Sequence, residues 1–422
     1  MIHARQLGHI PRLVVAGGLL GVLGPLMVGA WGAAQPTQGP SIVVLTIDKQ
    51  GKLVPTDEDA LGKLTARLTA ERPTHVFLVS HGWKNTLESS TKSYQKLNAA
   101  MGTLDDELKL RPKEFKPAVV GLHWPSQPFE KEEVQANDFL KRLSPENSAR
   151  LQKLLKTWYA AEDVTPFLTE KMPKEKVAKA FARMRLFMDG PGHAGGPDSP
   201  DLTGFSDEEV KTVLDAVRVF SFWEMKKRAG IVGANGARRV LLELQTAAPD
   251  AQFHLIGHSF GCKVLLSALA GEEVLAPVHS LVLLQGAVST DSFAEKVDVH
   301  GKTMQAGYRM VAAKGRVKGP IVATFSKNDS PLREAYPAAS HAAGEIAELE
   351  VRAFHEPLQA YRGMGAWGIT GTDPVTTIRD TNTPYGFQDG LYSVDGTDAI
   401  ACHSDVFGTK VAWLIWAAVL QR

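Results

Sequence analysis

The order of short apolar runs constrains the fold of this chain more than any other feature of its sequence. Each run is rich in Val, Ile and Leu, and most are followed by a segment of helical pattern. Continuous apolar runs are typical of strands buried on both faces, and strands joined by helices pair in parallel. The runs are SIVVLTID (41–48), HVFLVSHGW (75–83), AVVGLHWPS (118–126), AQFHLIGHS (251–259), HSLVLLQG (279–286), PIVATFSKND (320–329) and GLYSVDGTDAI (390–400). We therefore predict an α/β fold with a mostly parallel central sheet flanked by helices.

The segments between these runs predict helices and one insertion. Helical patterns cover residues 87–110, 206–228, 237–248, 260–270 and 406–422. The last of these contains the apolar stretch VAWLIWAAVL, which is too short for a membrane span, so we expect it to pack on the sheet. Residues 127–204 interrupt the alternation, because they are charged, helical in pattern and end in the Gly/Pro-rich loop DGPGHAGGPDSPDLTG. We predict one domain over residues 41–422 with a helical cap insertion at about 127–204.

The first 34 residues differ in composition from the rest of the chain. A short basic stretch, MIHARQLGHIPR, precedes the uncharged apolar run LVVAGGLLGVLGPLMVGAWGAA. This arrangement is typical of a secretory signal peptide, with Gly32-Ala33-Ala34 as the expected cleavage site. The run is also nearly long enough to span a bilayer, so an uncleaved N-terminal membrane anchor is the alternative. Both interpretations predict an exported protein, periplasmic or extracellular.

The sequence GHSFG, residues 257–261, lies where an apolar run meets a predicted helix. A G-x-S-x-G pattern at a strand-to-helix turn is a nucleophile elbow, which presents the serine hydroxyl at the carboxyl edge of the sheet. The turn is so sharp that only small residues fit beside the serine, which explains Gly257 and Gly261. The N-terminus of the next helix stabilises negative charge through its dipole and through the backbone N–H of Phe260. We predict that Ser259 is a nucleophile.

A nucleophilic serine requires a base and a carboxylate that orients the base. After an elbow of this kind, the partners follow in the chain order serine, acid, histidine. Asp329 ends a buried run, and His403 lies between the last predicted strand and the last predicted helix. We assign His403 as the general acid–base and Asp329 as the acid that orients it. Asp398 is the alternative acid, and the competing late histidines are His341 and His355.

A second donor for a developing oxyanion is expected in the loop after an early strand. The segment SHGW, residues 80–83, lies there: Gly82 lets the backbone approach a substrate and Trp83 offers its N–H. We expect the neighbouring histidines to line the site without transferring protons and the residues at the end of the next run to pack there. The neighbouring histidines are His81 and His258, and the residues at the end of the next run are His123 and Trp124.

Taken in order, the segments FLVSHGW, LHWPS, LIGHSFG, SKNDSPL and CHSDVFG resemble the α/β-hydrolase superfamily and, more narrowly, its bacterial serine esterase-like members. The resemblance covers residues 41–422 outside the insertion and implies a serine hydrolase with a cap over its site. The expected reaction is acyl transfer to water from a carboxylic ester, or from a lipid ester if the N-terminus stays in a membrane. The alternatives are a peptidase or acyltransferase with the same triad, and a binding or scaffold protein that has lost turnover.

Charge and cysteine content restrict partners and cofactors. The formal net charge is +1, so nothing in the electrostatics favours a nucleic-acid partner. No HExxH, CxxC or P-loop pattern occurs, so neither a metal nor a nucleotide cofactor is predicted. The two cysteines, Cys262 and Cys402, are close in sequence to Ser259 and His403. In an oxidising compartment they can form a disulfide, and two free thiols are the alternative.

Overall fold

The computed structural model describes residues 41–126, 225–271, 276–299, 302–313, 315–337, 340, 345–346, 349–350, 361–372 and 376–421. Three of the predicted segments lie outside these ranges, wholly or for the most part. They are the N-terminal segment 1–34, the cap insertion 127–204 and most of the predicted helix 206–228. His341 and His355 also lie outside the described residues.

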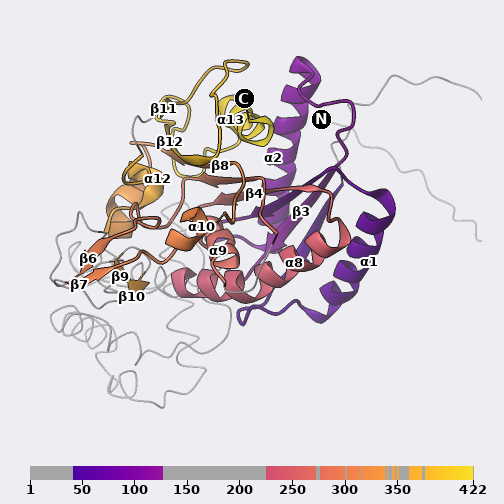
Figure 1. The fold of residues 1–422 in the computed structure, drawn as a ribbon, viewed down its shortest axis with the longest axis horizontal. Coiled ribbons are helices and arrows are strands. Elements are labelled where there is room, and N and C mark those ends of the chain that lie inside the picture. The colour runs from indigo at the N-terminus through magenta and orange to yellow at the C-terminus, as the bar shows by residue number, and fades with distance from the viewer. Residues whose placement is uncertain are drawn as a thin grey trace, which may run out of the picture. The chain divides into compact units, whose positions relative to one another are not determined.

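An eight-stranded sheet forms the centre of the described fold, and every strand pairing in it is parallel (Figure 1). Its strands, in spatial order, are β1 (Ile42–Thr46), β3 (Pro117–His123), β2 (His75–Ser80), β4 (Gln252–His258), β5 (Ser280–Leu284), β8 (Pro320–Phe325), β12 (Gly390–Asp395) and β11 (Thr376–Thr377). All except the short β11 correspond to apolar runs of the sequence. The predicted α/β fold with a mostly parallel sheet is confirmed.

Helices cover both faces of this sheet (Figure 1). One face packs against α1 (Pro55–Glu71), α8 (Arg238–Ala247) and α9 (Phe260–Leu269), and the other against α2 (Leu87–Leu108) and α13 (Thr409–Leu420). Successive strand residues divide between the two cores, as in β4, where Leu255 faces the first and Ile256 the second. The strands are therefore apolar without alternation because both of their faces are buried.

The apolar C-terminal helix packs as predicted. All residues of α13 from Val411 to Val419 are buried, and the indole N–H of Trp416 donates to the Met101 carbonyl of α2 at 3.0 Å. None of the helices in the described part of the chain has the length and hydropathy that crossing a bilayer requires.

One predicted break between helices is wrong. Residues 225–232 are helical, the π-helical turn η2 (Gly233–Ala237) continues them, and α8 follows directly. Glycine is unfavourable in the interior of a helix, but the structure uses Gly233 and Gly236 for close packing. A Cβ on Gly233 would lie 2.7 Å from the Cβ of Ser267 in α9, and one on Gly236 would lie 2.5 Å from Cγ2 of Ile47.

Shorter elements lie between β5 and β12. They are β6 (Val297–Val299), β7 (Lys302–Met304), α10 (Arg309–Ala313), η3 (Pro331–Ala335), β9 (Glu345–Ile346), β10 (Leu349–Glu350) and α12 (Met364–Trp367). These elements and helix α1 are additional to the predicted ones. The backbone of α12 is tied to the segment after β5, because Gly365 N–H donates to the Gly286 carbonyl at 3.0 Å.

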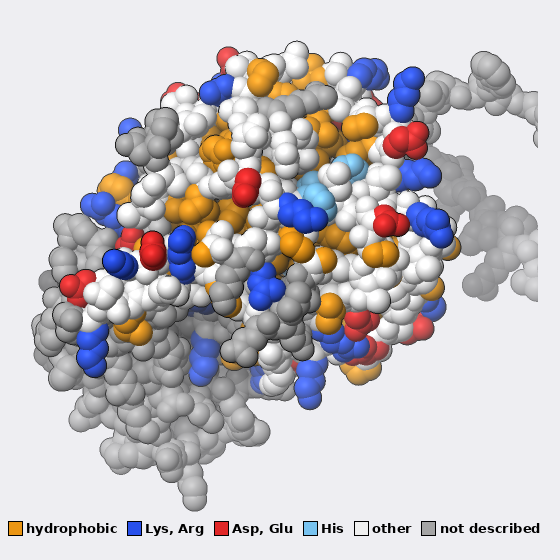
Figure 2. Space-filling view, in the orientation of Figure 1, with side chains coloured by type: hydrophobic (Ala, Val, Ile, Leu, Met, Phe, Trp, Pro, Cys, Tyr) orange, Lys and Arg blue, Asp and Glu red, His pale blue; other side chains and the backbone are white. Residues whose placement is uncertain are grey.

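Basic and acidic side chains are interspersed over the face of the molecule in Figure 2, in agreement with a net charge near zero. Hydrophobic side chains reach the surface between them in several small areas. The carboxyl ends of β2, β4, β8 and β12 carry the residues singled out in the sequence, and the site is built there.

Candidate active site

Ser259 lies at the sharp turn between β4 and α9. Its backbone has φ 56° and ψ −124°, a strained conformation for a residue with a side chain, and only 4 % of the residue is exposed. Its N–H donates to the Leu284 carbonyl, and its carbonyl accepts from the N–H groups of Cys262 and Ala287, each at 3.1 Å. These bonds hold the strained turn, and the serine hydroxyl is fixed at the start of the helix.

The two glycines of GHSFG permit the turn by close backbone contact. A Cβ on Gly257 would lie 2.7 Å from the Cα of Cys262. A Cβ on Gly261 would overlap the carbonyl of Ser80 and lie 2.7 Å from that of His81. A side chain at either position would therefore push α9 away from the ends of β4 and β2, so the sequence requires glycine at both.

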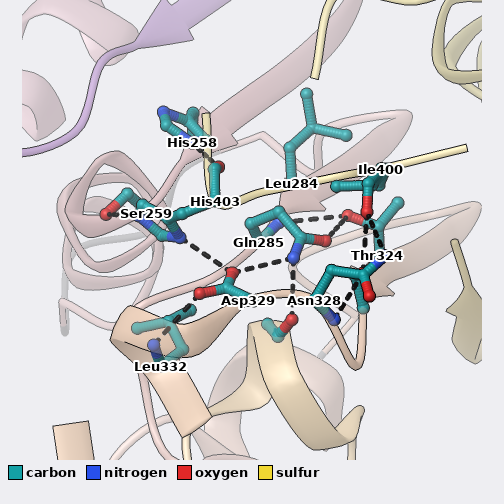
Figure 3. A network of polar contacts seen from close by, with 12 residues as sticks. His258, Ser259, Leu284, Gln285, Thr324, Asn328, Asp329, Leu332, Ile400 and His403 are labelled. Carbon is teal, nitrogen blue, oxygen red and sulfur yellow. Dashed lines mark hydrogen bonds and ion pairs between the residues drawn. The ribbon is translucent and has the colours of Figure 1, made fainter. Parts of the chain in front are cut away.

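His403 bridges Ser259 and Asp329 (Figure 3). Its Nδ1 lies 2.8 Å from Oδ2 of Asp329, and its Nε2 lies 2.8 Å from Oγ of Ser259. A carboxylate can only accept, so Nδ1 carries the proton and Nε2 keeps a lone pair for the serine hydroxyl. This arrangement can withdraw the proton of Ser259 while its oxygen attacks an electrophile.

Asp329 is fully buried, and its carboxylate accepts hydrogen bonds from two side chains and from the backbone. Oδ1 accepts from the backbone N–H of Leu332 at 3.0 Å, and Oδ2 accepts from His403 and from Nε2 of Gln285 at 2.8 Å. Asp398, the alternative acid, is exposed. Gln285 was not among the predicted site residues, although its position directly after a buried strand is a signal that could have indicated it.

The loop that carries Asp329 is bonded to the loop that carries His403. The Ile400 carbonyl accepts from Oγ of Ser326 at 2.8 Å and from Nδ2 of Asn328 at 3.1 Å. The two loops follow neighbouring parallel strands, β8 and β12, whose carboxyl ends meet at one edge. This strand pairing brings Asp329 and His403 together, although they are 74 positions apart in the sequence.

His258, the neighbour of Ser259 in the sequence, contacts the loop that carries His403. Its Nε2–H donates to the His403 carbonyl at 2.9 Å, and the two rings are 5.1 Å apart between centroids. Burial, followed by the charge of His403, lowers the pKa of His258 to about 4. His258 is therefore neutral at pH 7 and packs against the backbone of His403, in keeping with the lining role expected for it.

The segment after β2 lies directly against Ser259. A Cβ on Gly82 would lie 2.6 Å from the Cβ of Ser259. The carbonyl of Gly82 accepts from Nδ1 of His81 at 2.7 Å and from Nδ2 of Asn85 at 3.1 Å. Because a trans peptide directs its C=O and N–H to opposite sides, the N–H of Trp83 points away from these two donors. Asn85 is a further residue that the sequence did not indicate.

His81 is held as a neutral ring. Its Nε2 accepts from the backbone N–H of Trp124 at 3.2 Å, and burial lowers its pKa to about 3. The Trp124 indole in turn donates to the His81 carbonyl at 3.0 Å, while His123 pairs through Nδ1 with the hydroxyl of Ser90 at 3.0 Å. These residues pack the loop of Gly82, as expected of them.

The two cysteines are free thiols in the structure. Cys262 is buried, with Sγ 3.7 Å from the Leu284 carbonyl, and Cys402 is exposed. Burial raises the pKa of the Cys262 thiol. The disulfide allowed by the sequence is not formed. Among the described residues, no group of His, Cys, Asp and Glu side chains is arranged to hold a metal ion.

The geometry agrees with the comparison with known families. The sequence model of the alpha/beta hydrolase family matches residues 157–403, more than half of the chain. The chain belongs to this family, and family membership indicates a hydrolase that acts on a small-molecule substrate. No curated protein and no solved structure matches the chain.

Proposed function

We propose that the protein hydrolyses carboxylic esters through Ser259 as nucleophile, His403 as general acid–base and Asp329 as the acid that orients the histidine. The observation that carries this proposal is the position of His403, 2.8 Å from Ser259 Oγ on one side and 2.8 Å from Asp329 Oδ2 on the other. The strained backbone of Ser259 adds support, because strain of this kind costs on the order of 1–3 kcal/mol and is concentrated at functional sites.

In the first half of the reaction, Ser259 Oγ attacks the ester carbonyl carbon while its proton passes to Nε2 of His403. The buried carboxylate of Asp329 stabilises the imidazolium that results. The carbonyl oxygen becomes an oxyanion, which the backbone N–H groups of Phe260 and Trp83 bind, with Gly82 leaving room for the substrate. The tetrahedral intermediate then collapses: the leaving alkoxide takes the proton from Nε2, and an acyl-enzyme remains.

In the second half, a water molecule takes the place of the alcohol. The water attacks the acyl carbon while His403 removes one of its protons. When the second intermediate collapses, His403 gives this proton to Ser259 Oγ. Carboxylic acid is released and the serine is restored. The same triad serves acyltransferases and peptidases. A survey of substrates is therefore needed to identify the acyl acceptor and the kind of bond that is cleaved.

The proposal is tested with a fluorophosphonate probe, which reacts covalently with an activated serine. We expect labelling of the purified protein and loss of labelling in Ser259→Ala and His403→Ala. Ser404→Ala is the matched control, because Ser404 is exposed and neighbours His403. A folded wild-type protein that neither takes up the probe nor cleaves an activated ester would instead be a binding or scaffold protein.

The acid is tested separately on an activated ester. We expect Asp329→Asn to lower kcat by as much as roughly 10⁴-fold, because an asparagine at this position favours the wrong tautomer of the histidine. Asp398→Asn is the control: an exposed carboxylate without contact to the histidine leaves kcat within about twofold. Equal losses in the two variants would contradict the assignment. Esters of increasing chain length then define the substrate, from short acyl esters to lipid esters.

We further propose that the protein is exported and that residues 127–204 form a cap over the site. The basic and apolar composition of residues 1–34 supports export, with a cleaved signal or a retained anchor as the two forms. Mass spectrometry of the mature N-terminus distinguishes them: a mature chain that begins after Ala34 indicates cleavage, and an intact N-terminus in the membrane fraction indicates an anchor.

A further inference from the structure

We propose that Gln285 is a positioning residue for the acid of the triad: its side-chain amide holds the carboxylate of Asp329 in the orientation that His403 requires. This inference rests on the proposed function. Gln285 follows β5 directly and is completely buried, with 0 % of the residue exposed. Its backbone has φ 47°, in the left-handed region that side-chain-bearing residues rarely adopt. A buried, strained glutamine beside a site is retained only where its surroundings hold it.

Both ends of the Gln285 amide are satisfied (Figure 3). Nε2 donates to Oδ2 of Asp329 and to the Gly365 carbonyl, each at 2.8 Å, and Oε1 accepts from Oγ1 of Thr324 at 3.0 Å. The opposite orientation of the amide would direct its oxygen at a carboxylate and a carbonyl, two groups that only accept. The hydrogen-bond network therefore determines which atom is nitrogen.

The amide is also fixed in space by its own backbone. The hydroxyl of Thr324 on β8 accepts from the N–H of Gln285 at 3.0 Å while it donates to the Gln285 side chain. On the other side, α12 packs so closely that a Cβ on Gly365 would lie 2.6 Å from the Cα of Gln285. The Gly365 carbonyl accepts a second bond from the Ser326 N–H at 2.9 Å. The side chain of Gln285 thus links β5 to β8, to α12 and to the loop that carries Asp329.

The consequence for Asp329 follows from its donors. Oδ2 is shared between Nε2 of Gln285 and Nδ1 of His403, and Oδ1 is held by the Leu332 N–H. Without the amide, Oδ2 has the imidazole as its one remaining donor in this network, and the carboxylate gains freedom to turn. Gln285 touches no reacting atom, so it acts through Asp329.

The test compares Gln285→Met, which keeps the side-chain length and removes the amide, with wild type on an activated ester. We expect kcat/KM to fall roughly 10- to 100-fold, the effect of losing a hydrogen bond to a charged group, with KM nearly unchanged. In an Asp329→Asn background, the same substitution has little further effect. Gln245→Met is the matched control, because Gln245 is another buried glutamine whose amide donates, at 2.7 Å, to the Ala276 carbonyl. It reduces stability without changing kcat.

A readout that needs no turnover separates this inference from the proposed function. In Ser259→Ala protein, the proton between Nδ1 of His403 and Asp329 gives a far-downfield NMR resonance. We expect Gln285→Met to move this resonance upfield or to broaden it through faster exchange. An unchanged resonance, or a loss of kcat that is the same in the Asp329→Asn background, overturns the positioning role. Failure of probe labelling refutes the triad's function and leaves this NMR result to decide the contact.

A second variant tests the same proposal in case Gln285→Met protein does not fold. Thr324→Val keeps the shape of the side chain, removes the hydroxyl that anchors the Gln285 amide, and leaves Asp329 untouched. We expect a several-fold loss of kcat/KM and a smaller shift of the same NMR resonance. Wild-type kinetics and an unshifted resonance in folded Thr324→Val protein contradict the proposal.

Discussion

Replacing Gly82 with alanine tests whether the loop after β2 fixes the position of Ser259, the proposed nucleophile. An added Cβ would lie 2.6 Å from the Cβ of Ser259, whereas ordinary contact begins at 3.4 Å, so the two must separate by about 0.8 Å. Ser259 is held by three backbone hydrogen bonds, and the Gly82 carbonyl is held by His81 and Asn85, so neither side moves freely. A misplacement near 1 Å lowers rate by about 10²-fold. We expect Gly82→Ala to lose roughly 10²-fold in kcat/KM.

The measurement combines ester hydrolysis, the rate of fluorophosphonate labelling and thermal unfolding. Gly62→Ala is the matched control, since Gly62 lies on the exposed side of α1 with no atom within 4 Å of the added Cβ. This variant keeps wild-type activity and gains up to about 1 kcal/mol in the free energy of unfolding from better helix propensity. Folded Gly82→Ala protein with activity within threefold of wild type would refute the claim that this close contact positions Ser259.

Two further predictions concern the same loop and the opposite end of the sheet. Asn85→Ala removes the side-chain donor to the carbonyls of Gly82 and Trp83, each at 3.1 Å. We expect about a tenfold loss of kcat on an activated ester, with a smaller change in KM. An unchanged kcat would contradict this expectation. His75 and His254 are buried with Nδ1 and Nε2 3.0 Å apart. Burial, the larger cause, lowers the pKa of His75 to about 4 and that of His254 well below 6.5. From pH 6.5 down to about 4 the unfolded chain therefore binds protons that the folded chain does not. The free energy of unfolding should fall by about 1.4 kcal/mol per pH unit for each histidine, as followed by urea denaturation, with a shallower dependence in His254→Gln.

The parts of the site that the sequence predicted are those with a local or topological signal. Ser259 was indicated because the elbow is a contiguous pattern whose glycines have a steric reason. Asp329 and His403 were indicated because the carboxyl ends of parallel strands meet at one edge, so position after a strand implies proximity. The same reasoning assigned Asp329 but left Asp398 as an alternative, since both lie near strand ends. In the structure Asp329 is buried and Asp398 is exposed.

The supporting residues could not be predicted in this way. Gln285 follows a buried strand, as Asp329 does, but its role depends on an amide whose partner comes from another segment. Asn85 bonds to carbonyls two and three residues before it, and no local pattern marks such an amide. Glycine was ambiguous for a different reason. Gly233 and Gly236 have low helix propensity, but their close contacts with α9 and with Ile47 determine the structure there, and the helix continues through them.

The arrangement of the parallel sheet also has a kinetic consequence. The Ser259–His403 bond joins residues 144 positions apart, and the bond from Trp416 to Met101 joins residues 315 positions apart. Contacts of such long range form slowly, because loop closure precedes any gain from them. During refolding from denaturant, helices should therefore appear well before the site exists. The time at which fluorophosphonate begins to label Ser259 during refolding should therefore report when the sheet has closed and the site has formed.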